Sequence, residues 1–272
     1  MFLTLRKVRG ILLVLLLVGS VVVSLLINRS ESVVTQQVSQ MPHPKPSIVI
    51  VPGGFFDGTS WQHVISLLQQ DSYTVTAVQN PLISLPDDIA TTKRVIDAQH
   101  GPVVVVGHSY GGDVITAAAA NNPQVKALIY VSAFAPEPDE SISQLNGKYP
   151  PPLISTALVT DTADFLYVDR KKFHEVLAQD IPTVKAQVLA ATQKHAAKAV
   201  FAQAVDSAAW QSIPSWYLVT QGDGVINSEL QRFIAKRIGA KTTEIKSSHL
   251  SYISHPREVA NLIIKAASSA VK

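Results

Sequence analysis

The stretch VVVVGHSYGGDVITAAAA, residues 103–120, changes character at its middle. Its four valines indicate a buried β-strand, and the small residues that follow Gly111 indicate a helix. Between them, Gly107, Ser109 and Gly111 form the pattern G-x-S-x-G, whose glycines allow a sharp turn that holds the serine hydroxyl at the edge of a sheet. A phosphate-binding turn would be followed by a lysine, and none is present. We therefore predict that Ser109 is a nucleophile, which needs a base and an orienting acid elsewhere in the chain.

The sequence on either side of this turn alternates apolar strands with amphipathic helices. We expect strands at residues 47–54, 73–81, 102–109, 125–136, 215–223 and 241–248, and helices at residues 59–71, 84–101, 110–122, 228–240 and 255–268. Such alternation is typical of an α/β fold with a mostly parallel, doubly wound sheet that helices cover on both faces. The predicted domain spans residues 47–272, and its functional groups should lie at the carboxyl ends of the strands.

Residues 136–209 break this alternation. They contain a run of prolines at 150–152 and helical patterns, but no convincing core strand. Because so long an excursion between two strands is uncommon in a compact domain, we interpret it as an inserted helical cap over the sheet.

The N-terminal segment differs from the rest of the chain. Residues 1–28 place a basic flank before the apolar run 11–27, which predicts a signal anchor or a signal peptide. Residues 29–46 are polar and then rich in proline, as in a stalk. The basic flank should stay in the cytoplasm, so we expect an exported protein that is membrane-anchored, or secreted if the segment is cleaved.

Charge and cysteine content exclude several classes of function. The net charge of +3 lies within residues 1–40, so the remaining chain is neutral and has no electrostatic footprint for nucleic acid. The absence of cysteine excludes disulfides, thiol catalysis and cysteine metal sites. We expect no metal, no cofactor and a small-molecule substrate.

His249 is the histidine best placed to act as the base. It follows the last predicted strand and precedes the final helix, so it should lie in the last loop at the carboxyl edge. His255 stands directly before Pro256 and is typical of a helix-capping position. His108 lies inside the turn itself, and we interpret it as structural.

Asp223 is the favoured acid. It ends the strand at 215–223, which gives the chain order Ser109, Asp223, His249 with each residue after a separate strand. Glu137 and Asp139 are rivals because they follow the strand after the nucleophile. Asp113 is interpreted as a first-turn acid that complements the helix dipole.

An acyl-transfer site also needs donors for the developing oxyanion. The backbone N–H of Tyr110 is one candidate. Gly54 or Phe55, in the turn after the first strand, can offer the other.

Several longer segments resemble the α/β-hydrolase superfamily, and within it small bacterial esterase-like members. The segments are the turn from Gly53 to Trp61, NPLISLPDD, GPVVVVGHSYGG, SSHLSYISHPREVA, and GKYPP and FLYVD in the cap, so the resemblance covers about residues 47–268. It implies that Ser109 is the nucleophile, Asp223 the acid and His249 the base. Pro52 departs from the pattern because such proteins usually have histidine there, which puts the shape of the oxyanion loop in doubt.

Together these features predict a cofactor-independent serine hydrolase that acts on carboxylic esters. Aromatic and apolar residues should wall its substrate pocket: Phe134, Phe165 and Tyr167, with Leu166 and Trp210. An amide or lactone hydrolase, a lyase or cofactor-free oxygenase of the same fold, and a non-catalytic binding protein remain open alternatives. A haloalkane dehalogenase is disfavoured because it would need a carboxylate at position 109.

Overall fold

The computed structural model describes residues 45–270. In this part of the chain, the central sheet has six strands. The strands follow the order β2-β1-β3-β4-β8-β9, and every neighbouring pair is parallel. Their bounds are Ser47–Val51 (β1), Val75–Ala77 (β2), Val103–His108 (β3), Val125–Val131 (β4), Ser215–Thr220 (β8) and Lys241–Ile245 (β9). The predicted parallel α/β sheet is therefore confirmed.

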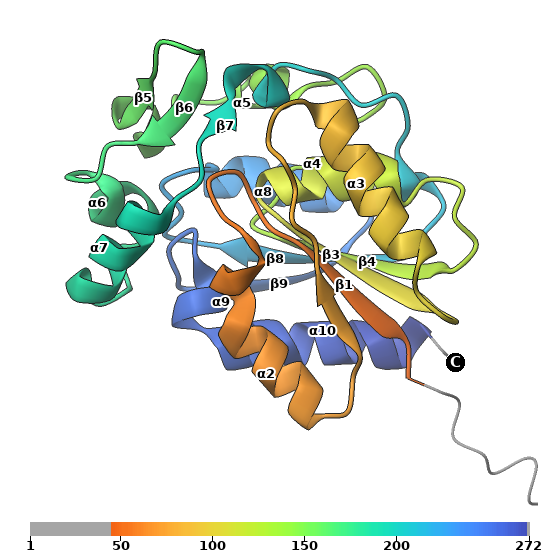
Figure 1. Cartoon of the computed structure of the whole chain (residues 1–272). Helices are drawn as coiled ribbons and strands as arrows, with labels where there is room; N and C mark the ends of the chain where they lie inside the picture. Colours follow the sequence, from red (N-terminus) through yellow and green to blue (C-terminus); the bar gives the residue numbers. More distant parts are fainter. Residues whose placement is uncertain (1–44, 271–272) are drawn as a thin grey trace, which may run out of the picture. The chain divides into compact units, whose positions relative to one another are not determined.

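Helices cover both faces of this sheet, as Figure 1 shows. On one face lie α3 (Leu85–Asp97), α4 (Tyr110–Ala118) and α8 (Ser228–Arg237), and on the other lie α2 (Gln62–Gln70) and α10 (Pro256–Ala270). The short helices η1 (Gly58–Trp61) and α9 (Ser251–Ser254) precede α2 and α10. The valines of β3 are fully buried because helices pack on both of its sides.

The cap is a mixed α/β unit, so the expectation of a helical cap is wrong in this respect. Its helical elements are α5 (Ile142–Asn146), η2 (Leu153–Thr156), α6 (Phe173–Leu177), α7 (Thr183–Thr192), η3 (Lys198–Phe201) and η4 (Ala209–Gln211). The strands β5 (Leu158–Thr160), β6 (Phe165–Val168) and β7 (Ala196–Ala197) form a separate antiparallel sheet. Strands of two to four residues are too short to show a periodic pattern in the sequence.

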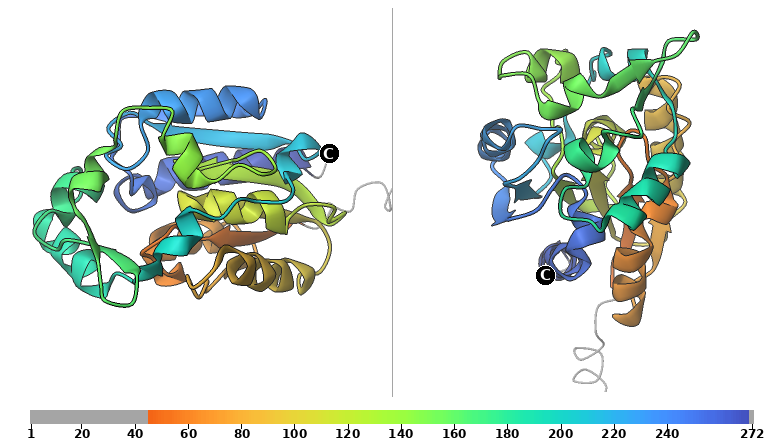
Figure 2. Two further views of the ribbon diagram at one scale, coloured as in Figure 1. Left: turned by 90° about the horizontal axis from the view of Figure 1, so that it is seen from above. Right: turned by 90° about the vertical axis from the view of Figure 1, so that its left-hand side faces the viewer.

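The turn between β5 and β6 explains why this part of the cap is extended. Asp161 accepts hydrogen bonds from the backbone N–H groups of Ala163 and Phe165, at 2.9 and 3.0 Å, and Asp164 adopts a positive φ of 61°. Such side-chain bonding favours a turn over a helix. In Figure 2 the cap lies beyond the edge at which the strands of the central sheet end.

The predicted anchor at residues 1–28 lies outside the described residues, as does most of the stalk at 29–46. Within residues 45–270, no helix is both long and apolar enough to cross a membrane.

Candidate active site

Ser109 stands at a strained corner between β3 and α4. Its φ of 52° and ψ of −123° lie in a region that residues with a side chain rarely adopt, at a cost of roughly 1–3 kcal/mol. The flanking glycines allow the corner because a Cβ at Gly107 would lie 2.6 Å from the Gly111 oxygen, and one at Gly111 would lie 2.2 Å from the Val51 oxygen. The G-x-S-x-G pattern is therefore a steric requirement of this backbone.

Tyr110, the residue after the serine, is fixed by a buried acid. Its hydroxyl donates a hydrogen bond of 2.7 Å to Asp88 on α3, whose other oxygen accepts a bond of 2.9 Å from the Leu82 N–H. Burial raises the pKa of both groups, and the carboxylate also raises that of the tyrosine. Leu82 and Asp88 both belong to the segment NPLISLPDD, so the contact gives these two residues of the segment a role that the sequence did not suggest.

His249 and Asp223 meet where the loops after β9 and β8 come together. The Nδ1 atom of His249 lies 2.9 Å from the Oδ2 atom of Asp223, and the two side chains are 2% and 0% exposed. This contact joins the two residues that chain order had paired, although they lie 26 positions apart. It leaves the Nε2 atom of the imidazole for another partner.

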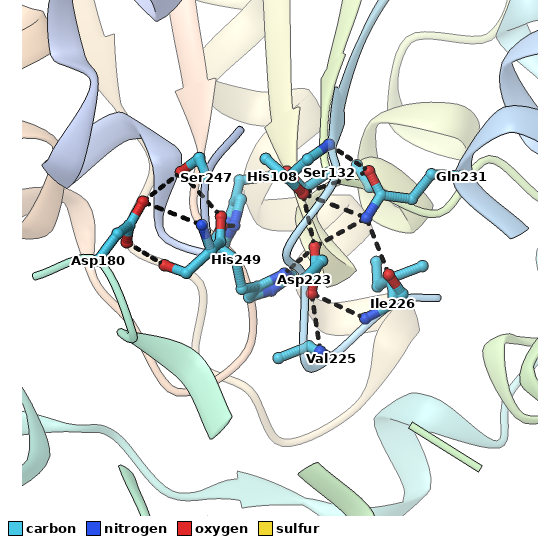
Figure 3. Close-up of polar contacts among 12 residues, drawn as sticks. His108, Ser132, Asp180, Asp223, Val225, Ile226, Gln231, Ser247 and His249 are labelled. Atoms are coloured by element: carbon cyan, nitrogen blue, oxygen red, sulfur yellow. Dashed lines mark hydrogen bonds and ion pairs between the residues drawn. The ribbon is translucent and has the colours of Figure 1, made fainter. Parts of the chain in front are cut away.

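Four further donors surround the Asp223 carboxylate, and Figure 3 labels Gln231, Val225 and Ile226 among them. Oδ2 accepts hydrogen bonds of 2.8 Å from the Thr220 hydroxyl and from Nε2 of Gln231. Oδ1 accepts bonds of 2.7 and 3.0 Å from the N–H groups of Val225 and Ile226. The carboxylate is thereby held in one orientation toward the imidazole. Sequence reasoning missed Gln231, because one polar residue on a buried helix face gives no signal for its partner.

His108, the last residue of β3, contacts the backbone of His249. Its Nε2 atom lies 3.0 Å from the His249 carbonyl oxygen, which as an acceptor requires the proton on Nε2. Burial, together with the neighbouring His249, lowers the pKa of His108 well below its ordinary value, so the ring is neutral. The ring packs against Trp61 and Tyr252, in keeping with the structural role that we expected.

The rival acids lie elsewhere. Glu137 and Asp139 are exposed, and the Glu137 N–H bonds to Glu140. Asp113 is fully buried, and within residues 45–270 neither of its carboxyl oxygens has a hydrogen-bond partner. Burial raises the pKa of Asp113 well above its ordinary value, with a contribution from Glu140. Asp113 does stand in the first turn of α4, as expected, but burial without a hydrogen-bond partner disfavours the charged form that an interaction with the helix dipole needs.

A cavity of about 270 Å³ lies between the cap and the carboxyl ends of the strands, and Ser109 and His249 both line it. Gly54 and Phe55 line it as well, and Phe55 has a positive φ of 71°. Tyr110 is the first residue of α4, where backbone N–H groups have no partner inside the helix. Gly54 and Phe55 therefore share the cavity with Ser109, whereas Tyr110 directly follows Ser109 in the chain and is not among the residues that line the cavity.

The rest of the cavity wall is mostly apolar. Its apolar residues include Phe55, Phe134, Ile154, Leu166, Leu177 and Phe201. Phe165 and Tyr167 are not part of the wall, which corrects the expectation for these two residues, and Tyr167 stacks on His195 instead. The reason is the alternation of side chains along β6, which turns Leu166 to the cavity and its two neighbours away. Trp210 donates a hydrogen bond to the Pro136 oxygen and does not line the cavity.

Within residues 45–270, no cluster of three or more His, Asp or Glu side chains could hold a metal ion.

Comparisons with known proteins place this fold in a family. The sequence pattern of the alpha/beta hydrolase family matches residues 48–262. An alpha/beta hydrolase, nvfD, of Aspergillus novofumigatus is 26% identical over 251 residues, which are 84% of this chain and 99% of that protein. A carbendazim hydrolyzing esterase of Nocardioides sp. is 28% identical over 126 residues, which are 42% of this chain and 52% of that protein.

A crystal structure of a pyrethroid hydrolase from Sphingobium faniae has the same fold. It superposes with a TM-score of 0.71 at 20% identity and covers 82% of this chain and 98% of its own. The family pattern covers the central sheet, the corner at Ser109 and the cap, in agreement with the geometry described above. The chain therefore belongs to the alpha/beta hydrolase family.

Proposed function

We propose that this chain is a serine hydrolase that cleaves carboxylic esters of small or medium apolar substrates through an acyl-enzyme. The observation that carries the proposal is the 2.9 Å contact between His249 and Asp223 at the edge of a cavity that Ser109 also lines. The names of the relatives agree, since one is an esterase and others are hydrolases.

The reaction follows from the roles of three side chains. The Ser109 hydroxyl attacks the ester carbonyl carbon while Nε2 of His249 takes its proton. Asp223 accepts the Nδ1–H of His249, which keeps Nε2 free to act as the base and stabilises the imidazolium that forms. The imidazolium then protonates the departing alkoxide, and a water molecule, activated by the same nitrogen, hydrolyses the acyl-serine.

The developing oxyanion is held by two backbone N–H groups, that of Tyr110 and that of Gly54 or Phe55. The positive φ values of Ser109 and Phe55 support this assignment, because strained backbone is kept where the surrounding structure enforces it. Proline at position 52 leaves both sets of donors intact, since it lacks only its own N–H.

The size and lining of the cavity support small or medium apolar esters. A volume of about 270 Å³ with aromatic and aliphatic walls favours an apolar acyl or alcohol group, and Phe134 contributes to that wall.

We also propose that the catalytic domain faces the outside of the cytoplasmic membrane. The support is the apolar run at residues 11–27 behind a basic flank. Protease treatment of intact cells and of spheroplasts tests this location: an exported domain is digested without lysis, whereas an internal domain is protected.

Ester turnover by the full chain tests the proposed chemistry. The wild type and Ser109→Ala are purified in mild detergent and offered p-nitrophenyl esters of increasing acyl length, with matching anilides and lactones. We expect hydrolysis of the short and medium esters and a loss of at least about 10³-fold in the variant. A folded wild type that turns over no ester contradicts the proposal and favours a binding protein or another reaction of the fold.

A further inference from the structure

The loop that carries His249 is also held by a residue of the cap. Asp180 lies in the segment between α6 and α7. Its Oδ2 atom accepts hydrogen bonds from the Ser247 hydroxyl at 2.8 Å (Figure 3), the Ser248 N–H at 3.0 Å and the Ser254 hydroxyl at 2.9 Å. Its Oδ1 atom accepts a fourth bond from the Ser248 hydroxyl. One carboxylate of the cap thus binds three residues that lie 67 to 74 positions later in the chain.

These contacts explain a sequence motif that the catalytic roles leave unexplained. The segment SSHLSYISHP repeats the pair Ser-His, first at residues 248–249 and again at 254–255. Asp180 bonds to the serine of each pair, and its Oδ2 atom lies 3.6 Å from Nδ1 of His255. The second pair therefore completes the binding site of the Asp180 carboxylate.

The carboxylate of Asp180 is suited to this role because it stays charged. Burial alone would raise its pKa, but the hydrogen bonds from Ser248, Ser247 and Ser254 outweigh that effect and hold the pKa below its ordinary value. Hydrogen bonds to a charged acceptor are stronger than those between neutral groups. The side chain is 27% exposed, so we expect its contribution to appear mainly in the position of the loop and less in stability.

His249 and the residue before it are held at three points. Asp223 fixes the imidazole, and His108 bonds to the carbonyl oxygen of His249. Asp180 binds the backbone N–H and the hydroxyl of Ser248, the residue directly before the base. The first two contacts come from the sheet and its loops, and the third comes from the cap.

We propose that Asp180 is a positioning residue for the base. Its hydrogen bonds tie the last loop to the cap, so the position of the cap fixes the position of His249. This proposal rests on the function proposed above. Removal of the carboxylate frees Ser247, Ser248 and Ser254 from the cap, and the loop then holds the imidazole less accurately over Ser109. Because a misplacement of about 1 Å can cost a reaction about 100-fold, the effect should appear in kcat. KM should change little, since Asp180 is not among the residues that line the cavity.

The test compares full-length wild type with Asp180→Ala and Asp180→Asn. Active sites are counted by the burst from a chromogenic phosphonate ester, and kcat and KM for p-nitrophenyl butyrate are then expressed per titrated site. We expect kcat per site to fall about 10- to 100-fold in Asp180→Ala, with KM within about twofold. Asp180→Asn should lose less, about threefold, because an amide oxygen can still accept from the Ser248 N–H.

Asp161→Ala is the matched control. Asp161 is another cap aspartate with two backbone hydrogen bonds, but it lies in the β5–β6 turn, and its contacts, those two bonds and a pairing with His195 at 3.5 Å, stay within the cap. We expect a lower melting temperature for this variant and a kcat per site within about twofold of the wild type, since no contact to the base is lost.

Each outcome separates the positioning role from its alternatives. A purely structural role of Asp180 would reduce the number of titrated sites while kcat per site stays at the wild-type value, and that result overturns the proposal. If Asp180→Ala does not fold, Asp180→Asn decides alone by the same criterion. A wild type without a burst refutes the proposed hydrolase itself.

Discussion

Replacement of Asp223 by asparagine tests the account of the base most sharply, because it removes a charge and leaves the shape of the side chain almost unchanged. The amide has one oxygen and one NH₂ group, whereas the carboxylate accepts hydrogen bonds on both oxygens. The effect therefore depends on which way the amide turns, and the surrounding donors decide that.

In one orientation the NH₂ group replaces Oδ1 and faces the backbone N–H groups of Val225 and Ile226, which are donors and cannot rearrange. Each buried group left without an acceptor costs about 1–3 kcal/mol, so this orientation costs about 2–6 kcal/mol.

In the other orientation the NH₂ group replaces Oδ2, and two of the three groups that it meets can adapt. The Thr220 hydroxyl can rotate, and His249 can move its proton from Nδ1 to Nε2. The Gln231 amide stays in place because it accepts from the Thr220 N–H and donates to the Ile226 oxygen, so this orientation leaves one donor without its acceptor, at about 1–3 kcal/mol. We expect this orientation to prevail. His249 then carries its proton on the nitrogen that should receive one from Ser109.

The expected result is a fall in kcat of about 10⁴-fold, which corresponds to about 5.5 kcal/mol in the activation barrier. The measurement is kcat for p-nitrophenyl acetate per folded molecule, with folding checked by circular dichroism. Glu137→Gln, at the exposed rival acid, serves as the control and should keep wild-type activity. An Asp223→Asn variant within tenfold of the wild type would refute the reasoning.

Three further predictions concern the pocket and stability. Leu166→Ala should enlarge the cavity and raise kcat/KM for longer acyl chains about tenfold. Tyr167→Ala, on the other face of β6, should leave the dependence of kcat/KM on acyl length unchanged. Equal effects of the two substitutions would contradict the assignment of Leu166 to the cavity wall. Among the described residues that line the cavity, Lys198 alone carries a formal charge, so Lys198→Met should raise KM about fivefold for an ester with a terminal carboxylate and leave neutral esters unaffected. Burial raises the pKa of Asp113, so the folded chain keeps a proton that the unfolded chain loses as the pH rises past the ordinary pKa of 3.8, and stability falls with rising pH. The melting temperature of Asp113→Asn should therefore match that of the wild type near pH 4 and lie above it at pH 8. A difference in melting temperature that is the same at both pH values would count against this.

The sequence was sufficient to predict the central sheet and the corner at Ser109, for local reasons. A run of valines that ends in glycines has few ways to fold, and the clash distances at Gly107 and Gly111 show why those positions exclude a side chain. Chain order after separate strands was enough to pair Asp223 with His249, because the carboxyl ends of parallel strands meet at one edge.

The features that sequence reasoning missed depend on contacts between distant segments. Asp180 gives no local signal in the sequence, since its partners lie about 70 positions away. They become its neighbours only in the folded chain, where the cap packs against the last loop. The choice between Leu166 and Tyr167 for the cavity wall requires knowledge of which face of β6 is turned inward, and a strand of four residues does not reveal this.

Mass-spectrometric mapping of the residue that a fluorophosphonate probe modifies tests the central claim most directly. The full chain is labelled, digested and compared with Ser109→Ala and with a heat-denatured sample. The account predicts one stoichiometric adduct, on the peptide that contains Ser109, and its absence from both comparison samples. An adduct on another residue, or a folded chain that does not react while it still hydrolyses esters, would contradict the assignment of Ser109 as the nucleophile.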